Sequence, residues 1–176
     1  MIISLRGTSG AGKSHMVRTI TDLYAKRIDK FEEGRRMPLY TIYGRNPEGR
    51  VLVTPGHYRI ANGGVDTLPD LDTAYRLARW AAKCDYDVLM EGKNMSDGVK
   101  RVNELVAEKF DVRVVVLNTD VPTCVKSVRE RGHRIAERSI ERTYAKVMRD
   151  VPNFHCETLI GDRESCLAEV RRWLNI

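Results

Sequence analysis

The chain of 176 residues carries 30 Lys and Arg against 24 Asp and Glu, which gives a net charge of +6 with the histidines neutral. This length predicts a single domain over residues 1–176 with a core of its own, so neither a disulfide framework nor a structural metal is needed for stability. No apolar run is long enough to cross a bilayer, and Arg6 and Gly7 interrupt the first run before a signal sequence forms. The four cysteines form no CxxC pair, which argues against zinc and favours reduced thiols in the cytoplasm.

The first predicted elements are a buried strand over residues 2–6, a Gly-rich turn and a helix over residues 13–28. The turn, GTSGAGKS, matches the motif GxxxxGK[ST] in full, and its place between strand and helix argues against a chance Gly-rich turn. Its glycines let backbone N–H groups wrap an anion, and the start of the helix adds its positive dipole end. We expect Lys13 to reach the β- and γ-phosphates and the Ser14 hydroxyl to ligate Mg²⁺. The candidate nucleotide-binding residues are Gly7, Thr8, Ser9, Gly10, Ala11, Gly12, Lys13, Ser14 and His15.

Two short strands over residues 39–43 and 50–54 flank the turn sequence GRNPEG and are expected to form a hairpin. The segment PGHYRIANGG that follows predicts an irregular loop, and a helix is expected to begin near residue 69 or 70. In this loop region Tyr58 could stack on a base, Asn62 could bond to a base edge, and Asp66 could act as general base. An ordinary surface loop is the alternative. The candidate acceptor-binding residues here are Tyr58, Asn62, Gly63, Gly64 and Asp66.

Residues 88–90 predict a buried strand that ends in Glu91-Gly92. Ligands of open α/β sheets bind at the carboxyl ends of the strands. A carboxylate at this point could hold the Mg²⁺ shell, directly or through water, or accept the proton of an attacking hydroxyl. The alternative is a partly exposed carboxylate with no chemical role.

The rest of the chain continues the alternation of strands and helices. We expect helices over residues 96–110, from 121, over 138–149 and over 164–174, and strands over 113–117 and 157–160. Strands separated by helices of this length predict the α/β class, with three α/β/α layers around a mainly parallel, five-stranded sheet.

Residues 126–149 carry most of the positive charge, with eight Lys and Arg against three Glu. Four basic residues recur every fourth position: Arg134, Arg138, Arg142 and Lys146. On a continuous helix they would line one face and repel one another by a few tenths of a kcal/mol per pair. Glu137 and Glu141 relieve part of this repulsion, so two interpretations stay open: a solvated face, or a surface that follows the phosphates of a nucleic acid.

The sequence VVVLNTDVPTCVKSVRERGHR, together with GTSGAGKS, resembles the P-loop kinase family of nucleoside, nucleotide and small-metabolite kinases over nearly the whole chain. The resemblance implies a P-loop fold, ATP and Mg²⁺ as cofactors, and an Arg-bearing lid at about residues 129–140. Its lid candidates are Arg129, Arg131 and Arg134, which would neutralise the phosphoryl group in transfer; an exposed basic helix end is the alternative.

The chain departs from the deoxynucleoside kinases, which carry an acid followed by Arg at the relevant strand end. No such pair occurs near Gly44-Arg45, so the general base stays open between Asp66 and Glu91.

Together these features predict an ATP-dependent kinase. Its catalytic candidates are Lys13, Asp66, Glu91, Arg131 and Arg134, with Arg138 added to the acceptor site. The basic segment favours an acceptor that is larger and more anionic than a free nucleoside. The phage-type kinases that phosphorylate 5-hydroxymethyluracil in DNA are a similar branch and provide the leading hypothesis, with a free nucleoside or nucleoside monophosphate acceptor as the alternative. From another class, a P-loop ATPase acting on a partner is disfavoured because no apolar run ends in Asp-Glu, and the chain lacks the NKxD run of a GTPase.

Overall fold

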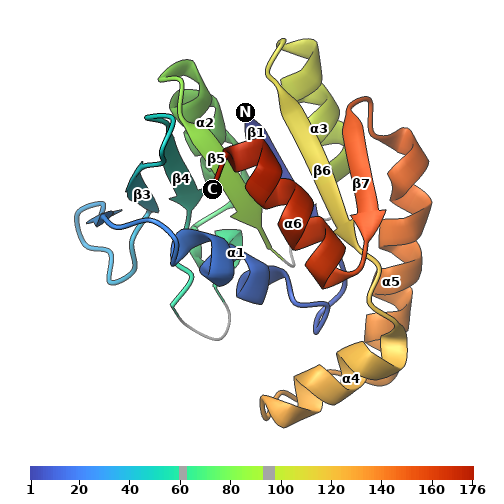
Figure 1. Cartoon of the computed structure of the whole chain (residues 1–176). Coiled ribbons are helices and arrows are strands. Elements are labelled where there is room, and N and C mark those ends of the chain that lie inside the picture. Colours follow the sequence, from blue (N-terminus) through green and yellow to red (C-terminus); the bar gives the residue numbers. More distant parts are fainter. Residues whose placement is uncertain (60–62, 93–97) are drawn as a thin grey trace.

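The computed structural model describes residues 1–59, 63–92 and 98–176. In this part of the chain a central sheet has the strand order β2-β3-β4-β5-β1-β6-β7, with helices on both faces (Figure 1). The strands are β1 (Ile2–Arg6), β2 (Arg27–Lys30), β3 (Tyr40–Arg45), β4 (Val51–Pro55), β5 (Asp87–Glu91), β6 (Val112–Leu117) and β7 (Glu157–Gly161). The helices are α1 (Lys13–Thr21), α2 (Leu71–Lys83), α3 (Gly98–Ala107), α4 (Val121–Glu130), α5 (Glu137–Asp150) and α6 (Arg163–Leu174), with short 3-10 turns η1 (Val65–Thr67) and η2 (Val151–Asn153). The predicted α/β class is confirmed.

The sheet has seven strands among the described residues, so the expected number of five was wrong. Five of the strands, β4, β5, β1, β6 and β7, pair in parallel, while β3 is antiparallel to β4 and β2 is antiparallel to β3. The expected hairpin is therefore present as β3 and β4.

The strand β2 replaces the second half of a helix that was expected to run to residue 28. Helix α1 ends at Thr21, with Asp22 as its last capping residue. Ile28, in the middle of β2, is 52% exposed. The strand thus forms through backbone pairing with β3 at the sheet edge, and no apolar pattern in the sequence predicts it.

Two apolar clusters hold the layers together, one on each face of the sheet. Ile3 and Leu5 of β1 pack toward α1 and α6, whereas Ile2 packs toward α2 and α3. This alternation is the period-two geometry of a strand buried on both faces. The carboxyl ends of the parallel strands all point to one edge of the sheet, where the Gly-rich turn, α4 and the start of α5 lie (Figure 1).

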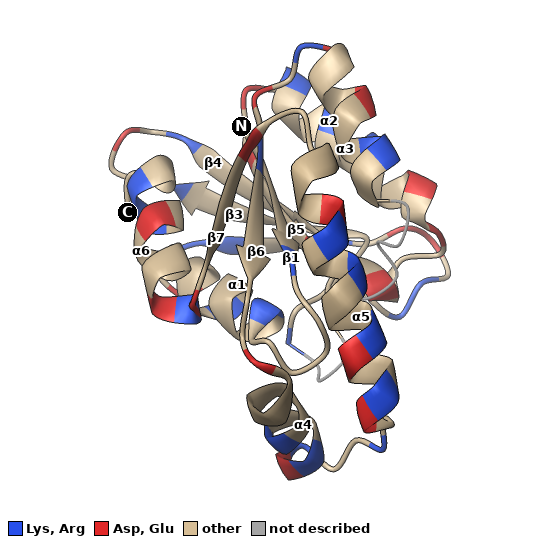
Figure 2. Ribbon diagram, turned by 90° about the vertical axis from the view of Figure 1, so that its right-hand side faces the viewer, with Lys and Arg blue, Asp and Glu red and all other residues tan. Residues whose placement is uncertain are grey.

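Helices α4 and α5 do not form the continuous basic face that the spacing suggested. Helix α4 ends at Glu130 and α5 begins at Glu137, so Arg134 lies in the connection and outside both helices. Lys146 is partly buried and lies 3.9 Å from Asp150. Basic and acidic residues are mixed along α5 (Figure 2). The exposed members of the predicted stripe that remain on this helix are Arg138 and Arg142.

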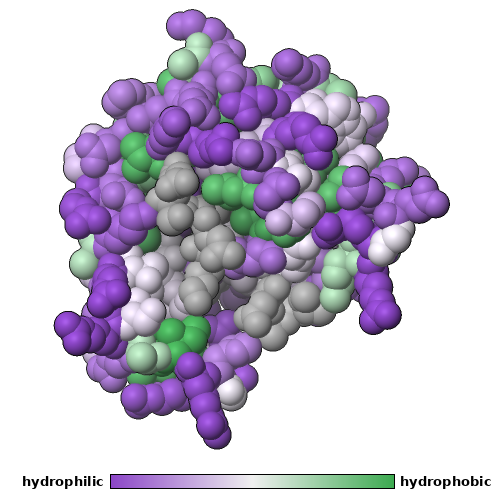
Figure 3. All heavy atoms as spheres, turned by 180° about the vertical axis from the view of Figure 1, so that it is seen from behind, coloured by the Kyte–Doolittle hydropathy of each residue, from purple (hydrophilic) through white to green (hydrophobic). Residues whose placement is uncertain are grey.

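Viewed from behind, the surface is mostly hydrophilic, with small separate apolar patches (Figure 3). Among the described residues no helix combines the length and the apolar character needed to span a bilayer. All four cysteines are free thiols.

Candidate active site

The Gly-rich turn leaves the end of β1 and leads directly into α1. Gly7, Gly10 and Gly12 have φ angles of 144°, 90° and 98°, and Gly12 is the N-cap of α1. A β-carbon on Gly10 would overlap the Cys124 carbonyl group, so the turn packs against the start of α4. The Thr8 hydroxyl donates a hydrogen bond of 3.1 Å to the Ile140 carbonyl, which ties the turn to α5. The fold therefore fixes, at the carboxyl edge of the sheet, a turn whose geometry is suited to binding an anion.

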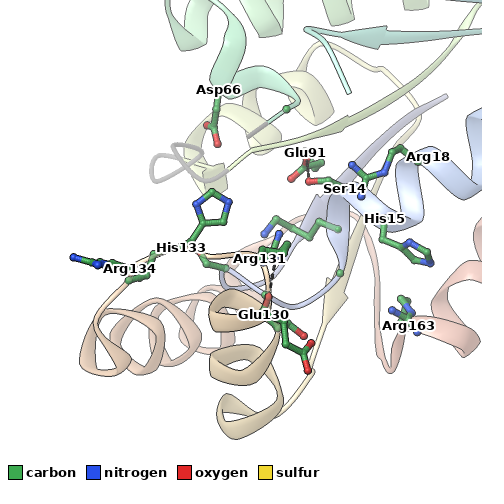
Figure 4. Close-up of a pocket in the computed structure, with 17 residues that line it drawn as sticks. Ser14, His15, Arg18, Asp66, Glu91, Glu130, Arg131, His133, Arg134 and Arg163 are labelled. Carbon is green, nitrogen blue, oxygen red and sulfur yellow. Dashed lines mark hydrogen bonds between the residues drawn. The ribbon is translucent and has the colours of Figure 1, made fainter. Parts of the chain in front are cut away.

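A cavity of about 630 Å³ opens above this turn (Figure 4). Its walls come from the Gly-rich turn and α1, from Gly63 and Asp66, from Glu91 at the end of β5, from the α4–α5 connection, and from Arg163 at the start of α6. Elements from across the chain thus meet at one place.

Lys13 lies at the base of the cavity with 8% of its surface exposed. Its Nζ donates hydrogen bonds to the carbonyl oxygens of Gly7 at 2.8 Å and Thr8 at 3.0 Å. Burial lowers the pKa of Lys13, and the charges of Glu91 and Asp66 act in the opposite direction. The ammonium group is therefore folded over the turn, beside two carboxylates.

Glu91 is 3% exposed, and its Oε1 accepts a hydrogen bond of 2.7 Å from the Ser14 hydroxyl. Burial raises the pKa of Glu91, while Lys13 and the Ser14 hydrogen bond lower it. A hydroxyl and a carboxylate are oxygen donors of the kind that Mg²⁺ prefers. No group of three or more His, Cys, Asp or Glu side chains is placed to hold a metal in the described ranges, so an ion here would draw further ligands from phosphate and water, as Mg²⁺ does.

Asp66, on the short turn η1, points into the cavity from the side opposite the α4–α5 connection (Figure 4). The backbone after Glu91 is packed closely against the same turn. A β-carbon on Gly92 would overlap the Val65 side chain and would lie 3.1 Å from Asp66 Oδ1. The position after Glu91 therefore has no room for a larger residue.

Two of the three lid candidates line the cavity, and the guanidinium group of Arg134 is turned away from Ser14 and Glu91 (Figure 4). Arg131 and Arg134 line it, with His133 between them, and Arg131 Nε donates a hydrogen bond of 3.0 Å to the Ser127 carbonyl. Arg129 is not part of the wall, because its guanidinium group lies 3.5 Å from Glu137. The cavity therefore brings together the Gly-rich turn, the carboxylates of Glu91 and Asp66, and the arginines that follow α4.

Comparison with known proteins identifies the family. Over 131 residues the chain is 39% identical to the 5-hmdU DNA kinase of Pseudomonas phage PaMx11, a match that covers 74% of this chain and 68% of that protein. The chain belongs to the 5-hmdU DNA kinase family. The predicted class of enzyme, an ATP-dependent phosphotransferase, is confirmed. No protein-family model matches the chain.

The fold of this kinase is that of deoxynucleoside kinases. The deoxyadenosine kinase of M. mycoides with bound dATP aligns over 100% of both chains, with a TM-score of 0.53 and 18% identity. The same enzyme with its products dCMP and dCDP aligns over 99% of both chains, with a TM-score of 0.53 and 15% identity.

Several expected site residues of the kinase lie elsewhere. Tyr58 is 3% exposed with its ring in the core, so in this arrangement it offers no face on which a base could stack. Gly64 is buried and Arg138 is exposed on α5, and neither lines the cavity. Asn62 lies outside the described residues. Gly63 and Asp66 are the expected acceptor residues that reach the cavity.

Sequence reasoning missed two arginines of the cavity wall. Arg18 follows Ser14 by one helical turn on α1, and its guanidinium group is turned toward Ser14 and Glu91 (Figure 4). The i,i+4 spacing from Ser14 was the available signal. Arg163 opens α6, and a β-carbon on Gly12 would lie 3.1 Å from its Cδ. The feature of the sequence that could have identified Arg163 is its position just after the last strand.

Proposed function

We propose that this kinase transfers the γ-phosphoryl group of ATP, with Mg²⁺, to the 5-hydroxymethyl group of hydroxymethyluracil in DNA. The observation that carries the proposal is the cavity itself, in which Lys13 and Ser14 face two carboxylates and the arginines of the α4–α5 connection. The activity named for the phage relative agrees with it.

The nucleotide half of the reaction belongs to the Gly-rich turn and the lid. Backbone N–H groups at the start of α1 and the Lys13 ammonium group bind the triphosphate. Ser14 and Glu91 would hold Mg²⁺, which supplies positive charge beside the β- and γ-phosphates. Arg131 and Arg134 belong to the opposite wall, from which they would neutralise the phosphoryl group in transfer and exclude water.

The two carboxylates have different roles. Glu91 is buried and bonded to the Ser14 hydroxyl, which assigns it to the metal shell. Asp66 is exposed and faces the cavity, so it can approach an acceptor hydroxyl and accept its proton as the phosphoryl group arrives.

A DNA acceptor also gives a role to the exposed arginines of α5. Arg138 and Arg142 lie on the helix that follows the lid, and neither lines the cavity. There they would contact backbone phosphates next to the target nucleotide, and binding would weaken steeply with salt. A viral kinase of this kind would work in the cytoplasm of its host, where the DNA is.

The test is transfer of labelled γ-phosphate from ATP to a matched set of acceptors. The set holds a DNA oligonucleotide with one hydroxymethyluracil, the same oligonucleotide with thymine, free hydroxymethyldeoxyuridine, deoxynucleosides and their monophosphates. We expect label on the hydroxymethyluracil DNA and none on its thymine twin. Preferential labelling of free nucleosides or monophosphates would replace the DNA acceptor, and full-rate hydrolysis of ATP without any acceptor would overturn the kinase assignment.

Two isosteric variants separate the carboxylates. Asp66→Asn should lower kcat and leave the Mg²⁺ dependence of ATP binding unchanged. Glu91→Gln should shift that Mg²⁺ dependence. The reverse pattern would exchange the two assignments.

A further inference from the structure

The sheet opens next to Glu91, and a tyrosine hydroxyl fills the gap. Strand β5 pairs with β1 as far as Glu91, but on its other side it pairs with β4 only at Asp87 and Val88. Beyond that point the Tyr58 hydroxyl accepts a hydrogen bond of 3.1 Å from the Glu91 backbone N–H. It also donates a longer one, 3.4 Å, to the Glu91 carbonyl. One side chain thus takes the place of the missing neighbour strand.

This hydroxyl is suited to accept and donate at once. Tyr58 is 3% exposed, and a phenol hydroxyl can donate one hydrogen bond while it accepts another. Without it, two backbone groups of Glu91 would be buried and unpaired, which costs free energy.

The backbone at Gly64 also packs closely against Glu91. A β-carbon on Gly64 would overlap the Glu91 carbonyl oxygen and would lie 2.9 Å from Oε1 of the carboxylate. Thr67 links His57, next to Tyr58, with Gly64. Its hydroxyl donates a hydrogen bond of 2.8 Å to the Gly64 carbonyl and accepts one of 3.0 Å from the His57 N–H. Glu91 is therefore held from its backbone and its side chain by residues that do not line the cavity wall.

We propose that Tyr58 is a positioning residue, which holds the backbone of Glu91 so that the carboxylate meets Ser14 and completes the Mg²⁺ site. Thr67 supports the same function through its hydrogen bonds to His57 and Gly64. The inference rests on the proposed Mg²⁺ site and not on the identity of the acceptor. Partners of this kind, which orient a metal ligand from behind, set metal affinity by about 10–100-fold.

The experiment measures ATP binding by calorimetry as a function of Mg²⁺ concentration, without acceptor. In Tyr58→Phe the ring still fills the core, but the hydroxyl is lost. We expect the Mg²⁺ concentration for half-maximal tightening of ATP binding to rise about tenfold. Binding of ATP in EDTA should stay as in the wild type, since the Gly-rich turn is intact.

Tyr43→Phe is the matched control. Tyr43 is 6% exposed in the same apolar cluster, and no hydrogen bond of its hydroxyl occurs in the described part of the chain. It should bind Mg²⁺ and ATP as the wild type does. An equal shift in both variants would mean that core packing causes the effect, and the proposal would fail.

Two further variants keep the inference testable if Tyr58→Phe folds poorly. Thr67→Val is nearly isosteric, removes both loop hydrogen bonds and should shift the Mg²⁺ dependence in the same direction. In a Glu91→Gln background, Tyr58→Phe should add no further shift, because it acts through that carboxylate. A full additional shift there, or wild-type Mg²⁺ dependence in both Tyr58→Phe and Thr67→Val, would overturn the proposal. None of these results depends on which acceptor is phosphorylated.

Discussion

Arg129 and Arg131 stand two positions apart and have different surroundings. Arg129 lies 3.5 Å from Glu137 at the start of α5, so it joins the two helices of the lid region. Arg131 caps the end of α4 and lines the cavity, where its charge also acts on the buried Lys13. Both are arginines near one helix end, but only Arg131 lines the cavity.

Substitution of these two residues separates chemistry from structure. Arg131→Ala should lower kcat by about 10²–10³-fold, the usual effect of removing one donor that stabilises transition-state charge. Arg129→Ala should keep a kcat near that of the wild type, since it removes an exposed ion pair of little energetic weight. Single-turnover transfer from labelled ATP measures both. Equal losses of kcat in the two variants would contradict the assignment of Arg131.

Helix α4 depends on its N-cap for its start and for its place against the Gly-rich turn. Asp120 accepts a hydrogen bond of 2.8 Å from the Thr123 N–H, and this bond holds the pKa of its carboxyl below the usual 3.8. A depressed pKa in the folded state stabilises the protein above the unfolded pKa, and this contribution is lost as the pH falls through the folded value.

Asp120→Ala should therefore lower the melting temperature at pH 7 and at pH 5 by the same amount. The difference from the wild type should shrink as the pH falls from the unfolded pKa, about 3.8, through the lower pKa of the folded state. Asp120→Asn keeps a capping oxygen and should lose less at pH 7. Thermal unfolding followed by circular dichroism measures this, and a difference that grows toward low pH would refute the cap assignment.

Elements that carry their own signal were predicted from the sequence, and elements that depend on distant partners were not. The Gly-rich turn, Lys13 and Ser14 are specified by local spacing, and the strand ending at Glu91 by its apolar run. Strand β2 exists through pairing with β3, so no pattern within residues 27–30 could reveal it. Tyr58 was predicted to stack on a base because its side chain is aromatic. Its hydrogen bonds with Glu91 join residues 33 positions apart in the sequence, so they can be recognised only in the folded structure.

At the scale of the whole molecule, the carboxyl and amino ends of the parallel strands have separate functions. The carboxyl edge carries the cavity, whereas the amino edge carries a buried ion cluster around Asp87 at the start of β5. Asp87 is 1% exposed and accepts two hydrogen bonds of 2.8 Å from Arg50, the residue before β4. The N-terminal ammonium group before β1 lies 3.3 Å from the same carboxylate. The Asp87 carboxylate therefore links β4, β5 and β1 at their amino ends, remote from the cavity.

Asp87→Asn should destabilise the protein without altering its nucleotide site. The change leaves Arg50 and the N-terminal ammonium group without their counter-charge. Loss of one partner of a fully buried pair costs 3–5 kcal/mol, and because the Arg50 side chain is 34% exposed we expect about 2 kcal/mol. Urea unfolding should show a lower midpoint with an unchanged m-value, and ATP affinity below the transition should equal that of the wild type.

The control uses the same arginine with a different partner. Asp85 lies 3.8 Å from Arg50 but its side chain is 91% exposed, and its backbone has a φ of 58°, which asparagine tolerates. Asp85→Asn should leave the urea midpoint almost unchanged, since water already screens that charge. If both variants lost equal stability, the energy would lie in the total charge around Arg50 rather than in burial. If Asp87→Asn weakened ATP binding, the separation of the two sheet edges would be wrong.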